Sequence, residues 1–375
     1  MNIGFDGKRA ANNLTGLGNY SRSLIAKLAH FFPQNHYYVY TPKVKDKPQI
    51  AAFLADDSIR LKLPHPGAIK LLWRSFGIKK QLHKDQIDVY HGLSQEIPIG
   101  LAANSELKTV VTIHDLIYLR YPQYYKAIDR YIYNRKSEYA CKKSDHIIAI
   151  SERTRQDIIE YYNIDPQKIE VIYQSCDNSF KQLAPLASKL AVTKKYNLPD
   201  QFLLIVGTIE PRKNLLLLIK ALPAINPDYK LVVVGKQQAY ARLVKSELEK
   251  LGLTDRVIFL EGLPFEDLPL IYQLATLFIY PSLYEGFGIP IIEALYSGTP
   301  VIAATGSCLE EAGGPDSIYI SPDNAEELAI QANRILDNKD LQEHMIQSGL
   351  QYVQRFDNEI LANQLMACYL KIINR

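Results

Sequence analysis

The sequence lacks any uninterrupted apolar run of about 18 residues, the length at which a membrane-spanning helix is expected. It also has few cysteines: there are four among 375 residues, Cys141, Cys176, Cys308 and Cys368, and they stand far apart. No two of them have the spacing of a disulfide framework or a metal site, so we predict a protein of the reducing cytoplasm without a metal site. The N-terminal residues begin an apolar strand at once and lack the basic and long apolar segments of a signal peptide.

A strong charge imbalance is missing as well. Lysine and arginine total 43 and aspartate and glutamate total 40, which gives a net charge of +3 at pH 7. Nucleic-acid binding needs a concentrated basic face, so nucleic acid is not an expected partner. Hydrophobic residues make up 47% and charged residues 22% of the chain, as in ordinary globular proteins.

The chain is longer than one ordinary core supports, and about two domains are expected. Apolar strand-like runs alternate with amphipathic helical patterns in both halves, which predicts an α/β fold for each half. The alternation stops between Gln174 and Pro199, which marks the crossing between the halves. We therefore place an N-terminal domain at residues 1–180, a C-terminal domain at residues 181–355, and a final helical segment at residues 356–375.

The most informative stretch begins with the apolar run at residues 277–280, which predicts a buried parallel strand. Two glycines, Gly286 and Gly288, then bracket Phe287, and Pro290 suits the first turn of a helix. The start of such a helix exposes unpaired N–H groups that favour an anion such as a phosphate. Because strand–turn–helix units are common, an ordinary structural turn is the alternative.

Two glutamates accompany this loop. Glu285 lies on the loop itself, and Glu293 follows inside the predicted helix. A carboxylate can accept hydrogen bonds from two neighbouring hydroxyl groups, as on a ribose or a hexose. Together with a phosphate-binding loop, this pair of glutamates suits a sugar nucleotide.

A second glycine turn, Gly16-Leu17-Gly18, precedes a helical pattern near the N-terminus and predicts another helix start that favours an anion. A dinucleotide-binding fingerprint would need a third glycine where Ser21 stands, and an acidic residue at the end of the next strand, residues 37–41. Neither is present, which argues against NAD binding here. A plain structural turn is again the alternative.

Polar residues follow the β-branched run at residues 109–113, where His114 and Asp115 stand. Open α/β sheets place ligands at the carboxyl ends of their strands, so His114 is a candidate site residue. A buried structural histidine is the alternative interpretation.

Two cations, Arg212 and Lys213, follow the strand predicted at residues 202–207, at the start of the next helix. Cations at that position oppose the helix dipole, so they are expected to bind something external. A diphosphate fits, with the arginine as a fork and the lysine as a point charge. Since no Asp-x-Asp follows a strand to hold a metal, we predict that no divalent metal is required.

A basic helical pattern with aromatic residues covers the segment from Ile69 to Lys84. A helix of this kind can lie on an anionic membrane surface, which would place the protein peripherally at the inner membrane face. A helix packed on a sheet, with its charged side in solvent, is the alternative.

Five segments together resemble a known family and follow its order across nearly the whole chain. They are Gly16-Leu17-Gly18-Asn19-Tyr20, His114-Asp115, Glu210-Pro211-Arg212-Lys213-Asn214, Glu285 through Glu293, and Gly298-Thr299-Pro300-Val301. The chain resembles the retaining, nucleotide-sugar-dependent glycosyltransferases of family 4, the glycosyl transferases group 1, and in detail their bacterial mannosyltransferase-like members. The resemblance implies the GT-B fold: two Rossmann-like, doubly wound domains that face each other across a cleft, with a C-terminal helix that crosses back to the N-terminal domain.

The resemblance also implies roles for residues at the matching positions. The acceptor would bind the N-terminal domain and the donor nucleotide the C-terminal domain, with no cofactor. The implied contacts are Arg212 and Lys213 to the diphosphate, Glu293 to the ribose hydroxyls, Glu285 and the backbone of Gly286, Phe287 and Gly288 to the donor sugar and phosphate, Gly16 and Gly18 to the diphosphate, and His114 near the reacting sugar.

Gly207, at the end of the first strand of the second half, belongs to the same implied donor site. Many family members have an arginine directly after this glycine, where the present chain has Thr208. The charge of the diphosphate would then be carried by Arg212 and Lys213 alone.

The predicted activity is transfer of a hexose, with mannose as one candidate, from a GDP- or UDP-sugar to a glycan or polyprenyl-linked acceptor in surface polysaccharide synthesis. The residues predicted to take part in catalysis are His114, Glu285, Arg212 and Lys213. Another GT-B activity, such as sugar-nucleotide epimerisation, and a non-catalytic partner subunit of the same fold are the alternatives.

Overall fold

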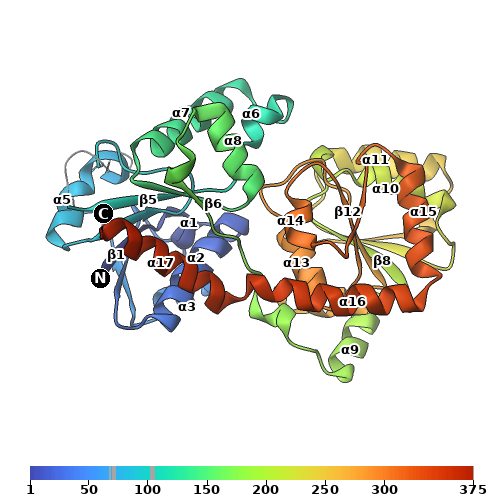
Figure 1. The fold of residues 1–375 in the computed structure, drawn as a ribbon. Helices are drawn as coiled ribbons and strands as arrows, with labels where there is room; N and C mark the ends of the chain where they lie inside the picture. Colours follow the sequence, from blue (N-terminus) through green and yellow to red (C-terminus); the bar gives the residue numbers. More distant parts are fainter. Residues whose placement is uncertain (67–68, 70–72, 102–105, 375) are drawn as a thin grey trace. The chain divides into compact units, whose positions relative to one another are not determined.

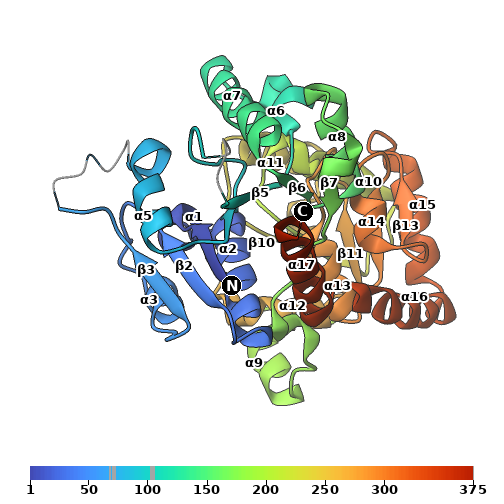
Figure 2. The same cartoon turned by 60° about the vertical axis from the view of Figure 1, so that its left-hand side comes forward.

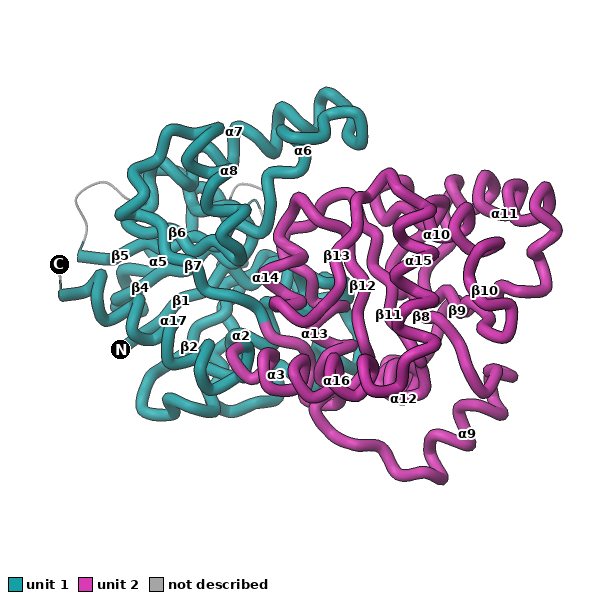
Figure 3. The backbone as a smooth tube through the Cα atoms, turned by 45° about the vertical axis from the view of Figure 1, so that its right-hand side comes forward, with its two compact units in different colours: residues 1–174, 356–375 teal, residues 175–355 magenta. Residues whose placement is uncertain are grey.

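The computed structural model describes residues 1–66, 69, 73–101 and 106–374. The chain divides into two compact units, drawn in teal and magenta in Figure 3. The first unit contains residues 1–174 and 356–375, and the second contains residues 175–355. Each unit has its own parallel sheet and its own hydrophobic core.

The first unit is built on a seven-stranded parallel sheet with the order β3-β2-β1-β4-β5-β6-β7. Its strands are β1 (Asn2–Asp6), β2 (His36–Tyr40), β3 (Ile59–Lys62), β4 (Val89–Gly92), β5 (Lys108–Ile113), β6 (His146–Ala149) and β7 (Ile169–Val171). Strand β1 has β2 on one side and β4 on the other, so the winding direction reverses there. Ligands of open parallel sheets bind beyond the carboxyl ends of the strands near such a reversal.

Helices cover both faces of this sheet. They are α1 (Lys8–Asn12), α2 (Gly16–Phe31), α3 (Pro48–Leu54), α5 (Lys79–Lys84), α6 (Ile117–Arg120), α7 (Ala127–Lys143), α8 (Glu152–Tyr162) and α17 (Asn358–Ile373), with a π-helical turn at Trp73–Gly77 and short 3-10 turns at Pro122–Tyr124 and Pro166–Lys168. Helix α3 lies next to the edge strand β3, as Figure 2 shows.

Alternate residues of the strands pack on opposite faces of the sheet, as the two-residue period of a strand requires. Val110 and Ile148 belong to the core shared with α2 and α17. Val111 and Ile147, one position along, belong to the core shared with α7 and α8. The near-continuous apolar runs of the sequence therefore reflect burial of the sheet on both faces.

The second unit repeats this plan with six parallel strands in the order β10-β9-β8-β11-β12-β13. They are β8 (Phe202–Val206), β9 (Lys230–Val234), β10 (Val257–Leu260), β11 (Leu277–Tyr280), β12 (Val301–Ala304) and β13 (Ile318–Ile320). The first strand of the unit, β8, again lies between the second and the fourth. Both sheets thus have the strand order of a doubly wound, Rossmann-like fold, and the predicted fold class is confirmed.

The helices of the second unit are α9 (Leu186–Tyr196), α10 (Leu215–Ala221), α11 (Tyr240–Lys250), α12 (Leu268–Leu274), α13 (Ile289–Tyr296), α14 (Leu309–Gly313), α15 (Ala325–Leu336) and α16 (Lys339–Val353). Short 3-10 turns occupy Asn178–Lys181, Pro211–Lys213, Leu222–Ala224, Thr254–Arg256, Phe265–Asp267 and Gln354–Phe356. Residues of β8, β9 and β11 pack against α10, α11 and α15 in a single core cluster.

The C-terminal helix α17 belongs to the first unit, although the chain reaches it from the second. Its start is fixed by Asp357, whose side chain accepts a hydrogen bond from the backbone N–H of Glu359. Its apolar side, including Leu365 and Tyr369, lies in the core with α2, beside which it runs in Figure 1. The prediction of a terminal helix that returns to the N-terminal domain is confirmed.

Two helices have no helical pattern in the sequence. Helix α1 follows β1, and at five residues it is too short to show a helical period. Helix α9 lies in the predicted crossing segment, and Leu186 and Leu190 on it are 71% and 60% exposed. A helix that buries so little of its apolar surface leaves no amphipathic pattern to detect.

The segment predicted as a helix from Ile69 to Lys84 falls partly outside the described residues. In the part that is described, Trp73 and Leu82 are buried in a core cluster with Tyr38 and Tyr90 on the sheet. This burial favours the interpretation of a helix packed on a sheet, while Phe76 remains 53% exposed. None of the described helices is long and apolar enough to span a membrane, and membrane contact through this segment stays a prediction.

Candidate active site

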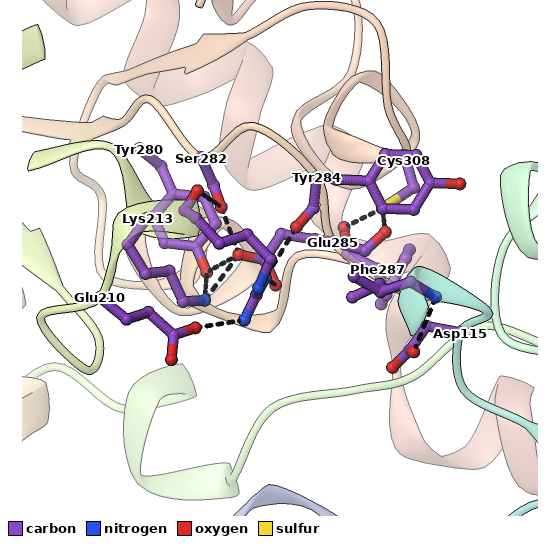
Figure 4. A network of polar contacts seen from close by, with 11 residues as sticks. Asp115, Glu210, Lys213, Tyr280, Ser282, Tyr284, Glu285, Phe287 and Cys308 are labelled. Atoms are coloured by element: carbon purple, nitrogen blue, oxygen red, sulfur yellow. Dashed lines mark hydrogen bonds and ion pairs between the residues drawn. The ribbon is translucent and has the colours of Figure 1, made fainter. Parts of the chain in front are cut away.

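Glu285 is the centre of the polar cluster beyond the carboxyl ends of β8 and β11. Its side chain is 12% exposed and forms ion pairs of 2.6 Å to Lys213 Nζ and of 2.6 Å to an Nη atom of Arg212. Each carboxylate oxygen therefore takes one cation. The hydroxyl groups of Tyr280 and Ser282 donate to the oxygen that also receives Lys213, as Figure 4 shows.

The two cations are held from several sides. Lys213 Nζ donates to the hydroxyl of Tyr280 at 2.6 Å, and lies 5.0 Å from the centre of the same ring. Arg212 donates to the backbone carbonyl of Tyr284 at 2.7 Å and to Glu210 at 2.7 Å. A cation fixed by several partners is preorganised for a ligand, since its orientation needs no further ordering.

Burial and charge act against each other on these groups. Burial by itself would raise the pKa of Glu285, but Lys213 and Arg212 outweigh it and lower the pKa to about 2. Burial lowers the pKa of Lys213, which Glu285 partly restores, while Glu285 and Glu210 raise the pKa of Arg212 against its own burial. The cluster thus holds two fixed positive charges and two carboxylates in a largely dry site.

The backbone around the cations is joined to the loop after β11. Asn214 adopts the left-handed conformation with φ 56°, and its side-chain amide donates to the carbonyls of Pro281 and Pro322. The carbonyl of Arg212 accepts a hydrogen bond from Leu283 N–H and lies 3.1 Å from the Ser282 hydroxyl oxygen. These contacts set the position of Arg212 and Lys213 relative to Glu285.

The glycine turn predicted at residues 286–288 leads into α13. Gly288 is the residue before the helix and has φ 146°, and a Cβ built on it would lie 2.9 Å from Cβ of Ala312. Only glycine suits both the conformation and the space. Phe287 is buried, and its carbonyl accepts a hydrogen bond from the Cys308 thiol at 2.7 Å. No sequence pattern indicated that Cys308 would help to position this turn.

Glu293 lies one turn into α13. The hydroxyl of Tyr272 donates to one of its carboxylate oxygens at 2.9 Å. Burial raises the pKa of Glu293 to about 7, with the charge of Asp177 adding to the effect and the Tyr272 hydrogen bond opposing it. Glu293 is thus poised between its acid and its carboxylate form at neutral pH, and only the carboxylate accepts hydrogen bonds with both oxygens.

Gly207 directly follows β8 and has φ 147°, a conformation that favours glycine. A Cβ at this position would lie 3.5 Å from Cε of Lys213, so the glycine borders the lysine side chain. The structure therefore brings Gly207, Lys213, Arg212 and Glu285 together at the end of β8. Tyr280 and Ser282 complete the same group, and sequence reasoning had assigned them no role.

In the first unit, His114 follows β5 and is 5% exposed. Its Nε2 lies 2.8 Å from the carbonyl of Leu93 and its Nδ1 lies 3.2 Å from the side-chain nitrogen of Gln174. The carbonyl can only accept, so Nε2 carries the proton and Nδ1 accepts from Gln174. Burial lowers the pKa of His114 to about 4, against the effect of the Leu93 carbonyl.

A chain of hydrogen bonds links α17, two strands of the sheet and α2, and its last member, Tyr20, contacts His114. Tyr369 on α17 bonds to one ring nitrogen of His91 at 2.6 Å, and Thr112 bonds to the other at 2.8 Å. Tyr20 on α2 bonds to the hydroxyl of Thr112, and its ring lies edge-on to the ring of His114 at 4.7 Å. The histidine predicted as a site residue is thus supported by α2, the sheet and α17 together.

The two N-terminal glycines have different surroundings. A Cβ on Gly18 would lie 1.9 Å from the carbonyl oxygen of Asn13, whereas a Cβ on Gly16 would have no atom within 4 Å. Gly18 is therefore required by the packing of its own unit. Gly16 is exposed at the first residue of α2 and leaves that helix start open to a ligand.

Comparison with known proteins agrees with this geometry. The profile of the family described as Glycosyltransferase Family 4 matches residues 15–180, and that of Glycosyl transferases group 1 matches residues 190–352. An O-antigen chain mannosyltransferase of Escherichia coli is 28% identical over 95% of this chain and 96% of the relative. A second O-antigen chain mannosyltransferase, from Salmonella typhimurium, is 31% identical over 57% of each chain.

The fold has matches among solved structures. A glycosyltransferase from Rickettsia africae superposes with a TM-score of 0.79 at 18% identity, covering 100% of this chain and 99% of that one. The two family profiles follow each other along the chain as the two Rossmann-like units do, and the resemblance noted from the sequence is confirmed. The chain is a glycosyltransferase of family 4 with the GT-B fold.

Proposed function

We propose that this chain transfers a hexose from a nucleoside diphosphate sugar to a glycan or lipid-linked acceptor in surface polysaccharide synthesis. The transfer is proposed to retain the anomeric configuration and to need no divalent metal. Mannose is the proposed hexose because both relatives compared above are named mannosyltransferases. The observation that carries the proposal is the buried cluster in which Arg212 and Lys213 are fixed around Glu285.

The cluster suits a diphosphate leaving group. As the glycosidic bond of the donor breaks, negative charge grows on the departing phosphate and positive charge on the sugar. Fixed cations stabilise the growing charge without reorganising, and one such donor is typically worth about 3 kcal/mol. Two cations and the start of α13 would supply the positive field that a bound metal supplies in other transferases, which is the basis for proposing metal independence.

The carboxylates of the cluster are poor nucleophiles. Both oxygens of Glu285 are occupied by cations, and the pKa near 2 shows that its charge is strongly stabilised. A covalent glycosyl intermediate on Glu285 is therefore disfavoured. The proposal for retention is instead attack by the acceptor on the same face from which the phosphate leaves, with that phosphate accepting the proton of the acceptor.

His114 is proposed to lie near the reacting sugar without exchanging protons with it. Its pKa near 4 keeps the ring neutral at physiological pH, and its Nε2 proton is engaged by Leu93. With Nε2–H bonded to Leu93 and Nδ1 bonded to Gln174, the ring has neither a free proton nor a free lone pair for acid–base catalysis. Gln174, which donates to the other ring nitrogen, would fix the orientation of the histidine.

The test is a transfer assay with GDP-mannose, UDP-glucose, UDP-GlcNAc and UDP-galactose, each with and without excess EDTA. We expect one donor, GDP-mannose, to be used with equal rates in both conditions, and NMR of the product to show the anomeric configuration of the donor. A strict Mg²⁺ requirement would overturn metal independence. Conversion of the donor without transfer would favour an epimerase, and no turnover of any donor would favour a non-catalytic subunit.

A further inference from the structure

Three side chains with metal-binding atoms meet in the first unit, and none of them has been given a role in the candidate active site. They are His146 on β6, Glu170 on β7 and Cys368 on α17, and one ligand atom from each lies within 4.8 Å of the other two. They are far apart in the sequence, so no spacing rule could have indicated them. The prediction that the chain has no metal site depended on such spacing.

The sheet and the helix explain why these residues meet. His146 is the first residue of β6, and Glu170 is paired with Ile148, two residues further along β6. Alternate residues of a strand share a face, so His146 and Glu170 point to the same side as Ile148. Ile148 lies in the core that α17 covers, which brings Cys368 of that helix to the same place.

The imidazole of His146 lacks the hydrogen bonds that a buried ring normally makes. The residue is 1% exposed, and neither of its ring nitrogens has a hydrogen-bond partner. Buried polar atoms are nearly always bonded, so such a ring calls for an explanation. Nε2 lies 3.4 Å from a carboxylate oxygen of Glu170, in contact with it but without the geometry of a hydrogen bond.

That distance fits two ligands of one metal ion. Nitrogen and oxygen ligands bind Zn²⁺ at about 2.0–2.1 Å in a tetrahedron, which separates them by about 3.4 Å. A thiolate, an imidazole and a carboxylate are also the donor set of zinc rather than of calcium or magnesium.

The local charge is compatible with a dication. Glu170 is an ordinary carboxyl group, anionic at neutral pH, and it faces the imidazole of His146. Lys371 Nζ lies 3.3 Å from the oxygen that faces His146. Its side chain is 50% exposed and can turn to solvent when a metal takes its place.

We propose that His146, Glu170 and Cys368 bind one zinc-class divalent cation, with water as a fourth ligand, and that this ion fastens α17 to the sheet of the first unit. The Cys368 thiol gives its proton to solvent on binding, as metal-bound thiolates do. The site lies at the start of β6, whereas His114 follows the carboxyl end of β5. The ion is structural and takes no part in the metal-independent transfer proposed above.

The first experiment measures binding directly on the full chain. The protein is stripped with a chelator, returned to Co²⁺ or Zn²⁺, and analysed for bound metal and for the thiolate-to-cobalt absorption band. We expect one ion per chain and the band, and at least a tenfold loss of affinity in Cys368→Ser and in Glu170→Gln. Glu170 is only partly buried, so its variant is expected to fold. Cys141→Ser, which alters a buried thiol of another core cluster, is the matched control and should bind like the parent.

The second experiment separates the metal site from a simple ion-pair network. In Lys371→Ala, a metal site predicts tighter binding because a competing cation is gone, and a melting temperature that still falls by several degrees when Zn²⁺ is removed. An ion-pair network predicts no metal effect on the melting temperature of either protein. Absence of stoichiometric metal, or binding that survives both Cys368→Ser and Glu170→Gln, would overturn the proposal.

Discussion

The two units have the same strand order but opposite chemistry at the end of their first strand. In the first unit, β1 ends in Asp6, an anion that Arg74 holds at 2.9 Å. In the second unit, β8 leads to Arg212 and Lys213, cations that Glu285 holds at 2.6 Å. The fold places charged side chains at both ends, and under the proposed function the cations of the second unit are the ones that face the diphosphate.

The histidines extend this contrast. The ends of β4 and β5 in the first unit carry His91 and His114, and burial lowers their pKa values to about 3 and about 4. Both rings are neutral at pH 7 and have both nitrogens in hydrogen bonds. The first unit thus has neutral, oriented rings at these strand ends, whereas the second has fixed charges.

The largest effect is expected from removing a cation of the second unit. Lys213→Ala should lower turnover at least tenfold, and toward a hundredfold if the lysine stabilises the departing phosphate directly. The melting temperature should change little, because Arg212 still pairs with Glu285. Steady-state kinetics with the preferred donor, together with thermal unfolding, measure both quantities.

The matched control is Lys250→Ala, which removes a lysine whose side chain is 67% exposed in the same unit. It should leave turnover unchanged. Wild-type turnover in Lys213→Ala would show that this lysine does not act on the diphosphate. The proposed difference in charge between the two strand ends would then have no effect on activity.

A smaller effect is expected from the pH dependence of Glu293. Its pKa near 7 means that the carboxylate fraction rises about tenfold between pH 6 and pH 8. If this carboxylate holds the ribose hydroxyls, the KM for the donor should fall by about that factor over the same range. Glu293→Gln should have a higher KM without this pH dependence, and Glu249→Gln, on the exposed side of α11, should behave like the parent.

The raised pKa of Glu293 also predicts how the stability of the protein changes with pH. The folded carboxyl keeps its proton up to about pH 7, whereas its ordinary value is 4.5, so the folded state binds more protons between these values. The free energy of unfolding of the ligand-free protein should therefore fall as pH rises from 4.5 to 7. A KM that is flat with pH in the parent would contradict the assignment of Glu293.

Local signals in the sequence predicted much of the fold. Helix α8 (Glu152–Tyr162) begins where Ser151, a favoured capping residue, accepts a hydrogen bond from Thr154 N–H. The glycine turn before α13 was likewise readable from Gly288 and Pro290. Periodicity and caps are properties of neighbouring residues, so they survive without knowledge of the fold.

Pairings across the fold could not be predicted in this way. Glu285 was expected to touch the donor, but its ion pairs with residues 72 and 73 positions earlier depend on how β8 and β11 are placed side by side. The same holds for Gln174, which orients His114 from 60 positions away. The protonation states of the site residues could not be predicted either, because they depend on burial. Loss of solvent is the main cause of the shifted pKa values of His114 and Glu293.

The smallest effect is expected at the N-terminal glycine turn, where two neighbouring glycines can be compared. Gly16→Ala meets open space, so stability should not change, and alanine favours a helix start no less than glycine. If the backbone of α2 approaches the diphosphate there, the added methyl group should raise the KM for the donor a few-fold. Gly18→Ala places a methyl group against the carbonyl of Asn13 and should lower the melting temperature of the first unit by several degrees. An unchanged KM for the donor in Gly16→Ala would show that the start of α2 does not contact the donor, which would then bind through the second unit.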